Sequence, residues 1–204
     1  MQFRRSKPCA PSNNVKLGTV NYYGARDLAA SFRTVRKNTL IVAEEIPEDK
    51  YSYRPAEGTR TVAELLAHIA LGGKFQEQIN LIEKRFSMQG FDYMKFMSGV
   101  AADAAKPRTK AEILALLKEE GEKYAKAVES LPDDILGESI VMPPGGDPPS
   151  RTRFDMLASV KEHEMHHRGQ LMLIERLLGI TPHLTRHNQA RRAAMQPGAP
   201  RPGN

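Results

Sequence analysis

Two histidines near the C-terminal end of the chain, His163 and His167, stand four residues apart in the segment HEMHHRGQL. On a helix, side chains at positions i and i+4 lie one turn apart on the same face. Two imidazoles placed in this way can bind one metal ion, as the helical H-x-x-x-H pair of zinc sites does. The spacing therefore makes a metal site the first chemical hypothesis. The alternative is a pair of core histidines that form hydrogen bonds with carboxylates or water.

The helix predicted around this pair turns both histidines toward the protein interior. Residues at steps of three and four form the series Met156, Val160, His163, His167, Leu171, Ile174 and Leu178. Such a series is the buried seam of a bundle helix. Buried imidazoles cost free energy unless their nitrogens find partners, and one metal ion would supply a partner to both. His166 lies to one side of this seam, so we expect it to be a flanking, exposed residue.

A second helix that carries a histidine is predicted over residues 61–86. Its seam also alternates three and four residues, in the order Leu65, His68, Gly72, Phe75, Ile79, Ile82 and Phe86. His68 is the only polar side chain in this seam, and Gly72 removes side-chain bulk one turn further on. Three inward-facing histidines from two helices are difficult to explain as ordinary core residues. We therefore predict that His68, His163 and His167 bind one divalent metal ion together.

Two further helices complete an all-α pattern, which predicts a four-helix bundle of the up-down type. They are expected over residues 25–46 and 110–131, and each carries a one-sided apolar stripe. In the second stripe, Gly121 could leave space for a cavity that Tyr124 would line, or Tyr124 could be a core residue. The long connection over residues 87–108 is expected to contain some helix and to cover one end of the bundle. Residues 132–150 are predicted to form an irregular loop, and Thr152 with Asp155 indicates a capping box.

The two ends of the chain differ from the bundle in composition. Residues 1–20 and 186–204 contain eight basic and no acidic residues, so a net charge of +6 leaves about −2 between them. We therefore expect flexible basic ends, with domain boundaries at 1–20, 21–182 and 183–204, and no nucleic-acid partner. His183 and His187 are expected to face solvent. The single cysteine, Cys9, and the lack of a signal segment or membrane span predict a cytoplasmic protein.

His163 and His167 also match the H-E-x-x-H pattern of zinc proteases, with Glu164 as the acidic residue. In that fold a third ligand follows the helix, and His183 would be the candidate. The bundle pattern and the position of His68 favour a different architecture.

The segments YRPAEGTRTVAELLAHIA and RTRFDMLASVKEHEMHHRGQLMLIERLLGI resemble the DinB/YfiT-like family of metal-dependent four-helix-bundle proteins. The likeness covers most of residues 21–182. It implies a metal triad made of one histidine in the second helix and an i, i+4 pair in the last, which falls on His68, His163 and His167. Relatives include thiol S-transferases that use bacillithiol or mycothiol, and mycothiol-dependent maleylpyruvate isomerases. Many members have no known reaction, so the resemblance implies the fold more firmly than the activity.

These observations predict a metal-dependent thiol S-transferase that acts on small electrophiles with a low-molecular-weight thiol. A metal-dependent hydrolase is the second enzyme hypothesis, and a non-catalytic, stress-linked bundle with a structural metal is the third. Zinc or nickel suits three imidazoles, and iron and manganese are further candidates. Glu164, Gln170 and Tyr124 are the candidates for lining the cavity. A small-molecule substrate and a homodimer are the expected partners.

Overall fold

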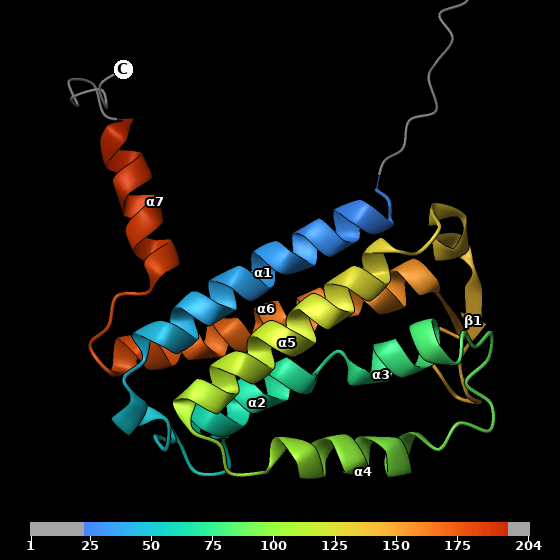
Figure 1. Cartoon of the computed structure of the whole chain (residues 1–204), viewed down its shortest axis with the longest axis horizontal. Coiled ribbons are helices and arrows are strands. Elements are labelled where there is room, and N and C mark those ends of the chain that lie inside the picture. Colours follow the sequence, from blue (N-terminus) through green and yellow to red (C-terminus); the bar gives the residue numbers. More distant parts are fainter. Residues whose placement is uncertain (1–22, 196–204) are drawn as a thin grey trace, which may run out of the picture.

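The computed structural model describes residues 23–195, so the expectations for residues 1–20, including Cys9, lie outside the described part of the chain. Four helices build the core: α1 (Ala25–Glu45), α2 (Val62–Leu71), α5 (Lys110–Glu129) and α6 (Arg153–Leu177) (Figure 1). The predicted all-α four-helix bundle is confirmed. Within the described residues, no helix combines the length and the apolar character needed to cross a membrane.

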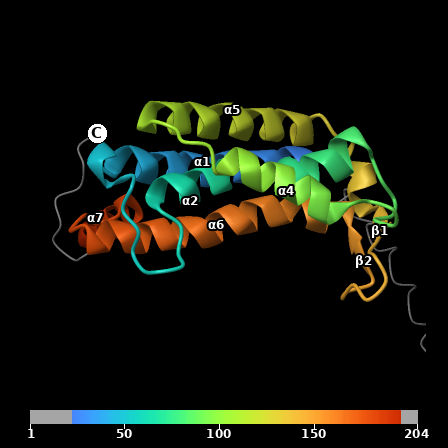
Figure 2. The same cartoon turned by 90° about the horizontal axis from the view of Figure 1, so that it is seen from below.

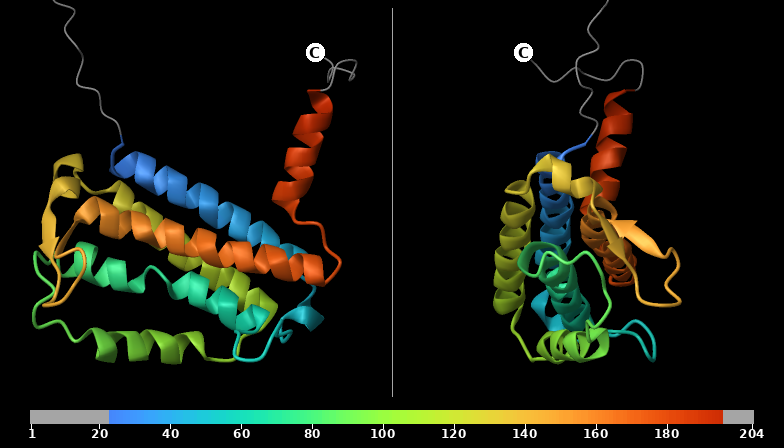
Figure 3. Two further views of the ribbon diagram at one scale, coloured as in Figure 1. Left: turned by 180° about the vertical axis from the view of Figure 1, so that it is seen from behind. Right: turned by 90° about the vertical axis from the view of Figure 1, so that its right-hand side faces the viewer.

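The order of the helices in space differs from a simple up-down bundle. α1 and α2 each pack against both α5 and α6, so they lie diagonally across the bundle (Figure 3, right). α2 and α5 run in the same direction, as do α1 and α6 (Figures 1 and 2). The prediction of an up-down order is therefore wrong. The cause is the long connection between α2 and α5, which returns the chain to the end of the bundle where α2 begins.

The ends of the helices follow the sequence signals closely. Thr61 caps α2 by accepting a hydrogen bond from the backbone N–H of Glu64. Thr152 caps α6 in the same way, with 3.1 Å between its Oγ1 and the nitrogen of Asp155. The Asp155 carboxylate does not return this contact and pairs with Arg151 instead. The predicted cap of α6 is present, but the reciprocal half of the capping box is not.

The helix predicted over residues 61–86 is broken in two. α2 ends at Leu71, the Gly72–Gly73 pair forms a turn, and a short α3 (Lys74–Gln76) continues into the π-helical turn η2 (Glu77–Ile82). A glycine pair weakens a helix, and a π-turn shifts the helical phase. As a result, Ile82 is 62% exposed and Phe86 is 60% exposed, so their predicted burial is wrong.

The connection to α5 contains α4 (Tyr93–Ala104), as the sequence predicted. α4 lies along the outer side of α2 and α3 and does not close an end of the bundle (Figure 2). An aromatic cluster fixes this position, because the ring of Phe75 contacts Phe91, Tyr93 and Phe96 at centroid distances of 5.8, 5.1 and 6.3 Å. This aromatic packing holds α4 against the side of the bundle.

Residues 132–150 are more regular than predicted. They contain the 3-10 helix η3 (Asp133–Gly137) and β1 (Ser139–Val141), which pairs with β2 (Ser150–Thr152) as an antiparallel hairpin. A second 3-10 turn, η1 (Glu48–Lys50), follows Pro47 at the end of α1. The strands have three residues each, which is too short for a period-2 pattern to be recognised.

The segment after Pro182 forms a helix, α7 (His183–Ala194), where the sequence predicted an irregular tail. α7 stands away from the bundle (Figures 1 and 3) and buries none of its own residues. It therefore lacks the apolar stripe by which the other helices were predicted. Its first turn is held by polar contacts, because Arg186 pairs with Glu45 and His183 Nε2 lies 3.2 Å from Asn38 Oδ1. His183 is thus half-buried and not solvent-facing, whereas His187 is exposed as predicted.

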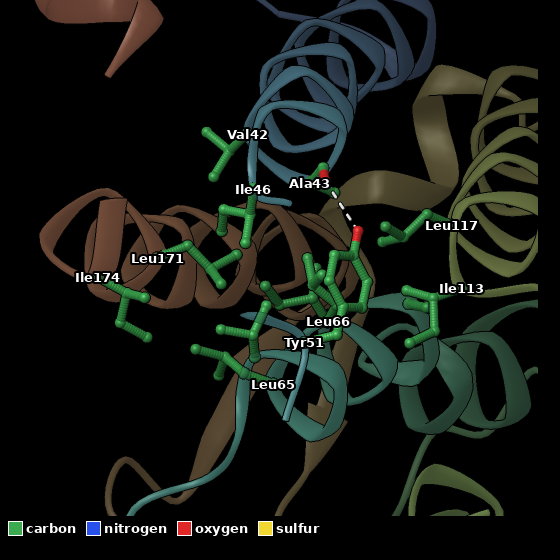
Figure 4. Close-up of a cluster of buried hydrophobic side chains, with 13 residues drawn as sticks. Val42, Ala43, Ile46, Tyr51, Leu65, Leu66, Ile113, Leu117, Leu171 and Ile174 are labelled. Atoms are coloured by element: carbon green, nitrogen blue, oxygen red, sulfur yellow. Dashed lines mark hydrogen bonds between the residues drawn. The ribbon is translucent and has the colours of Figure 1, made fainter. Parts of the chain in front are cut away.

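Two large apolar clusters form the core at opposite ends of the bundle, and a smaller third cluster consists of Ile79, Met88, Ile140 and Met156. Figure 4 shows the first, in which the Tyr51 hydroxyl donates to the Ala43 carbonyl at 2.8 Å. The second surrounds Phe32, Tyr124 and Leu157. Leu28, Val35, Thr39, Val42 and Ile46 of the first predicted stripe are all buried, which confirms that stripe.

A buried ion pair separates the two apolar clusters. Arg36 Nε donates to both carboxylate oxygens of Glu164 at 3.0 Å, and both side chains are almost fully buried. The same guanidinium donates to the carbonyls of Leu117 and Ile69 at 2.5 and 3.4 Å. A Cβ at Gly121 would lie 2.7 Å from Arg36 Nη1, so this glycine makes room for the arginine.

The buried carboxyl of Glu175 predicts a measurable dependence of stability on pH. Burial, together with the neighbouring Glu45, raises the pKa of Glu175 to about 7. The folded chain therefore binds more protons than the unfolded chain between the ordinary glutamate pKa and about 7, so its stability falls as pH rises through this window. The variant Glu175→Gln should lose less stability than wild type between pH 5 and pH 8. Urea unfolding with a chelator present measures this difference.

Glu162→Gln, on an exposed position of the same helix, is the control and should leave the pH profile of wild type unchanged. Equal pH profiles for wild type and Glu175→Gln would contradict the prediction.

Candidate metal centre

The three predicted histidines meet at one point. His68 comes from α2, and His163 and His167 come from successive turns of α6. Their Nε2 atoms form a nearly equilateral triangle, with 2.9 Å from His68 to His163, 3.1 Å from His68 to His167 and 3.1 Å from His163 to His167. The predicted convergence is confirmed. Within the described residues, this is the cluster of histidine, cysteine and acidic side chains that could hold a metal ion.

The triangle fits a metal ion better than it fits hydrogen bonds among the rings. A neutral imidazole carries one N–H, which points in a single direction in the ring plane, so three mutually close nitrogens cannot all be satisfied by one another. Sides of 2.9–3.1 Å allow one ion to reach all three nitrogens with Zn–N bonds of about 2.0–2.1 Å. Ligation by these residues stays a prediction, since their placement alone does not establish it.

The surroundings keep the three imidazoles neutral, which is the form that binds metals. Burial is the main cause and lowers the pKa of His68 to about 3 and that of His163 to about 4. The pKa of His167 is also lowered, again chiefly by burial. The positive charge of Arg60 acts in the same direction on all three rings. At neutral pH each of the three imidazoles therefore has one nitrogen with a free lone pair.

Gly72 leaves the space that the ring of His163 occupies. A Cβ at this position would lie 2.8 Å from His163 Nδ1 and 2.9 Å from Cε1, which is closer than real carbon contacts allow. The sequence had predicted that this glycine removes bulk beside the histidine seam, and the structure identifies His163 as the residue that uses the space.

The variant Gly72→Ala is expected to weaken zinc binding by about 10–100-fold, the range for residues that hold a ligand in place. The backbone at Gly72 is right-handed helical, with φ −60° and ψ −20°, so alanine is strained only by its contact with the ring. Competition with a chromophoric chelator measures the affinity. Gly73→Ala is the matched control, because its Cβ would lie 3.4 Å from the nearest atom, in the ring of Tyr124. Equal affinities for the two variants would contradict the steric role of Gly72.

Of the three cavity-lining candidates, only Gln170 lies at the site. Its Oε1 accepts a hydrogen bond from His167 Nδ1 at 2.8 Å, which leaves His167 Nε2 free to face the other rings. The carboxylate of Glu164 is bound to Arg36, and the Tyr124 hydroxyl donates to the Leu157 carbonyl at 2.9 Å. Neither Glu164 nor Tyr124 therefore lines the pocket at the histidines, and Tyr124 is a core residue, as the alternative interpretation expected. The i, i+3 spacing of His167 and Gln170 on one helix is the sequence signal that could have indicated this hydrogen bond.

The zinc-protease hypothesis does not fit this geometry. Glu164 points away from the histidine triangle and into the ion pair with Arg36. The third histidine at the triangle is His68, while His183 contacts Asn38. His166 is exposed, as predicted, and its ring lies beside His167 with a centroid distance of 4.9 Å.

A pocket of about 900 Å³ opens beside the triangle, and both His68 and Gln170 line it. Its apolar wall comes from α2, α4 and α6, and its polar rim comes from the loop before α2, which carries Arg54 and Arg60. Sequence reasoning missed Arg60, because its only signal is its place eight residues before His68. The arrangement can hold a small molecule next to a metal ion.

Comparison with known proteins supports the same family. YjoA of Bacillus subtilis (strain 168), an uncharacterized protein, is 27% identical over 157 residues, which are 77% of this chain and 92% of YjoA. The crystal structure of this DinB-like protein has a TM-score of 0.55 at 26% identity and covers 76% of this chain and 92% of its own.

Two more distant structures show the fold alone. A DinB-like protein of Bacillus cereus ATCC 10987 has a TM-score of 0.59 at 16% identity, over 79% of this chain and 97% of its own. YfiT from Bacillus subtilis, described as a probable metal-dependent hydrolase with an unusual four-helix bundle topology, has a TM-score of 0.57 at 17% identity, over 77% of this chain and 89% of its own. The model of the DinB superfamily matches residues 31–171, well over half of the sequence. The chain belongs to the DinB superfamily.

Proposed function

We propose that this chain is a metal-dependent enzyme in which His68, His163 and His167 hold one divalent ion beside the pocket for a small substrate. The observation that carries the proposal is the triangle of three Nε2 atoms, with sides of 2.9–3.1 Å, next to a pocket of about 900 Å³. Zinc and nickel are the favoured ions because both bind imidazole well, with iron and manganese as further candidates.

An ion held by three neutral imidazoles keeps its full charge and lowers the pKa of a water or thiol that binds to it. The chain positions the ligands for this task. Gln170 fixes the ring of His167, the space at Gly72 admits the ring of His163, and burial keeps His68 neutral. The open side of the triangle adjoins the pocket, where His68 is part of the wall.

The favoured reaction is the transfer of a low-molecular-weight thiol to a small electrophile. Hydrolysis normally needs a protein acid or base that activates the water or protonates the leaving group. A thiol, with an ordinary pKa of about 8.5, loses its proton far more readily than water does. Glu64 lies at the pocket but already accepts from Arg54 and from the backbone N–H of Thr61. Glu164 is bound to Arg36. Neither carboxylate is free to serve as a base, which favours a thiol.

A metal-dependent hydrolase is the second candidate, and the description of YfiT favours it. YfiT shares the fold at 17% identity, so the support that it gives to a hydrolase rests on analogy between folds.

The test is a panel of reactions with protein loaded with zinc or nickel. Small electrophiles are offered with and without a low-molecular-weight thiol, and ester and amide substrates are offered without one. The proposal expects turnover that depends on thiol and metal and is lost in His68→Ala. Turnover without thiol would select the hydrolase. No turnover, together with folding that depends on the metal, would support the structural role and contradict an enzyme.

A further inference from the structure

The pocket beside the histidine triangle has an apolar wall and a charged rim. Ala101 and Ala104 of α4 and Ala105 directly after it line the pocket together with Leu173 and Leu177 of α6. Leu173 and Leu177 are 58% and 57% exposed and lie one helical turn apart, so with the alanines they form one contiguous apolar surface along the pocket. The wall is therefore suited to the apolar body of a small molecule.

The rim carries one positive charge without an ion-pair or hydrogen-bond partner among the described residues. Arg54 forms an ion pair with Glu64 at 3.1 Å, and the Glu64 carboxylate also accepts from the backbone N–H of Thr61 at 2.7 Å. These contacts use the one acidic group that lines the pocket. Arg60, by contrast, forms no ion pair or hydrogen bond with any residue between 23 and 195.

Arg60 lies within electrostatic range of the triangle, since its charge acts on His68, His163 and His167 alike. A divalent ion on three neutral ligands would add a second positive charge to the same pocket. Two cationic groups beside a partly apolar cavity repel each other unless an anion binds between or beside them. Arg60 is exposed where it lines the pocket and is therefore available to an incoming anion.

We propose that Arg60 binds the carboxylate of an organic acid whose apolar body rests on α4 and α6, with its reactive end toward the histidine triangle. A guanidinium suits this role because its planar donors match the two oxygens of a carboxylate. The inference deepens the proposed function and rests on it only for the metal at the triangle. The carboxylate could belong to the electrophile or to the thiol, because both can be organic acids.

Two acid–amide pairs test the proposal by calorimetric titration of metal-free and zinc-loaded protein. 4-Phenylbutyrate and its amide represent a substrate without a thiol, and N-acetylcysteine and its amide represent the thiol. Wild type should bind at least one acid about tenfold more tightly than its amide, as expected for a charge-assisted contact, and Arg60→Gln should remove this preference. The preferred pair identifies which reactant carries the carboxylate.

The double variant Arg54→Gln/Glu64→Gln is the matched control, because it removes a charge pair from the same rim and leaves the net charge unchanged. It should keep the preference for the acid. Equal binding of acid and amide by wild type, or an equal loss in Arg60→Gln and the control, would overturn the proposal. The preference for acid over amide, measured in metal-free protein, separates the role of Arg60 from the metal hypothesis. If it persists while zinc fails to bind, the metal hypothesis fails alone; if zinc binds without an acid preference, the role of Arg60 fails alone.

Discussion

Replacing His68 with alanine is expected to lower the affinity for zinc by about two to three orders of magnitude. Structural zinc sites with four ligands bind with roughly 10–16 kcal/mol, so each ligand contributes on the order of 3–4 kcal/mol. His68 is also the one histidine of the triangle that comes from α2, so its loss removes the contact between the two helices at the triangle. The remaining pair on α6 would bind zinc only weakly.

His166→Ala is the matched control for this prediction. His166 is adjacent to His167, is exposed and lies outside the triangle. Its removal should leave the zinc affinity within about a factor of three of wild type, as for surface substitutions. Competition with a chromophoric chelator gives both affinities, and circular dichroism checks that each variant folds. Equal losses in the two variants would contradict the assignment of His68 as a metal ligand.

Replacing Arg36 with methionine is expected to destabilise the fold by about 3–5 kcal/mol, because it leaves a buried carboxylate without its partner. Glu164 is 1% exposed, and the guanidinium of Arg36 contacts both of its oxygens. The substitution also removes the donor to the Leu117 carbonyl. Chemical denaturation of wild type and variant measures the difference in unfolding free energy.

Two further variants separate the buried charge from a general loss of packing. Arg33 lies on the same helix as Arg36 and forms solvent-exposed ion pairs with Glu122 and Glu129 of α5. Its replacement by methionine should cost at most about 1 kcal/mol. The double variant Arg36→Met/Glu164→Leu should recover part of the stability lost by Arg36→Met, since neither charge of this pair is left buried without the other. A double variant that is less stable than Arg36→Met would refute this explanation.

The helices and the histidine triangle follow from patterns that lie within single segments of the chain. The seam from Met156 to Leu178 has a helical period, and both of its histidines turn inward as that period requires. His68 was identified by the same rule, since it interrupts an apolar seam. Periodicity identifies the buried face, and two buried faces that both contain histidine indicate a shared site.

The errors arise where a contact joins distant residues or where the local geometry departs from an ideal helix. Arg36 and Glu164 are 128 residues apart, and no pattern in one sequence shows that they pair. The turn at Gly72–Gly73 and the π-helical turn after it shift the phase of the helix, so Ile82 and Phe86 lie outside the core. α7 has no apolar period because polar contacts of Arg186 and His183 position it.

The most direct test of the metal centre is anomalous X-ray diffraction from crystals of zinc-loaded protein, recorded on both sides of the zinc absorption edge. One strong peak bonded to the Nε2 atoms of His68, His163 and His167 is the predicted result. A triangle without a peak at saturating zinc, or a peak bonded to other side chains only, would contradict the assignment of these three residues as ligands.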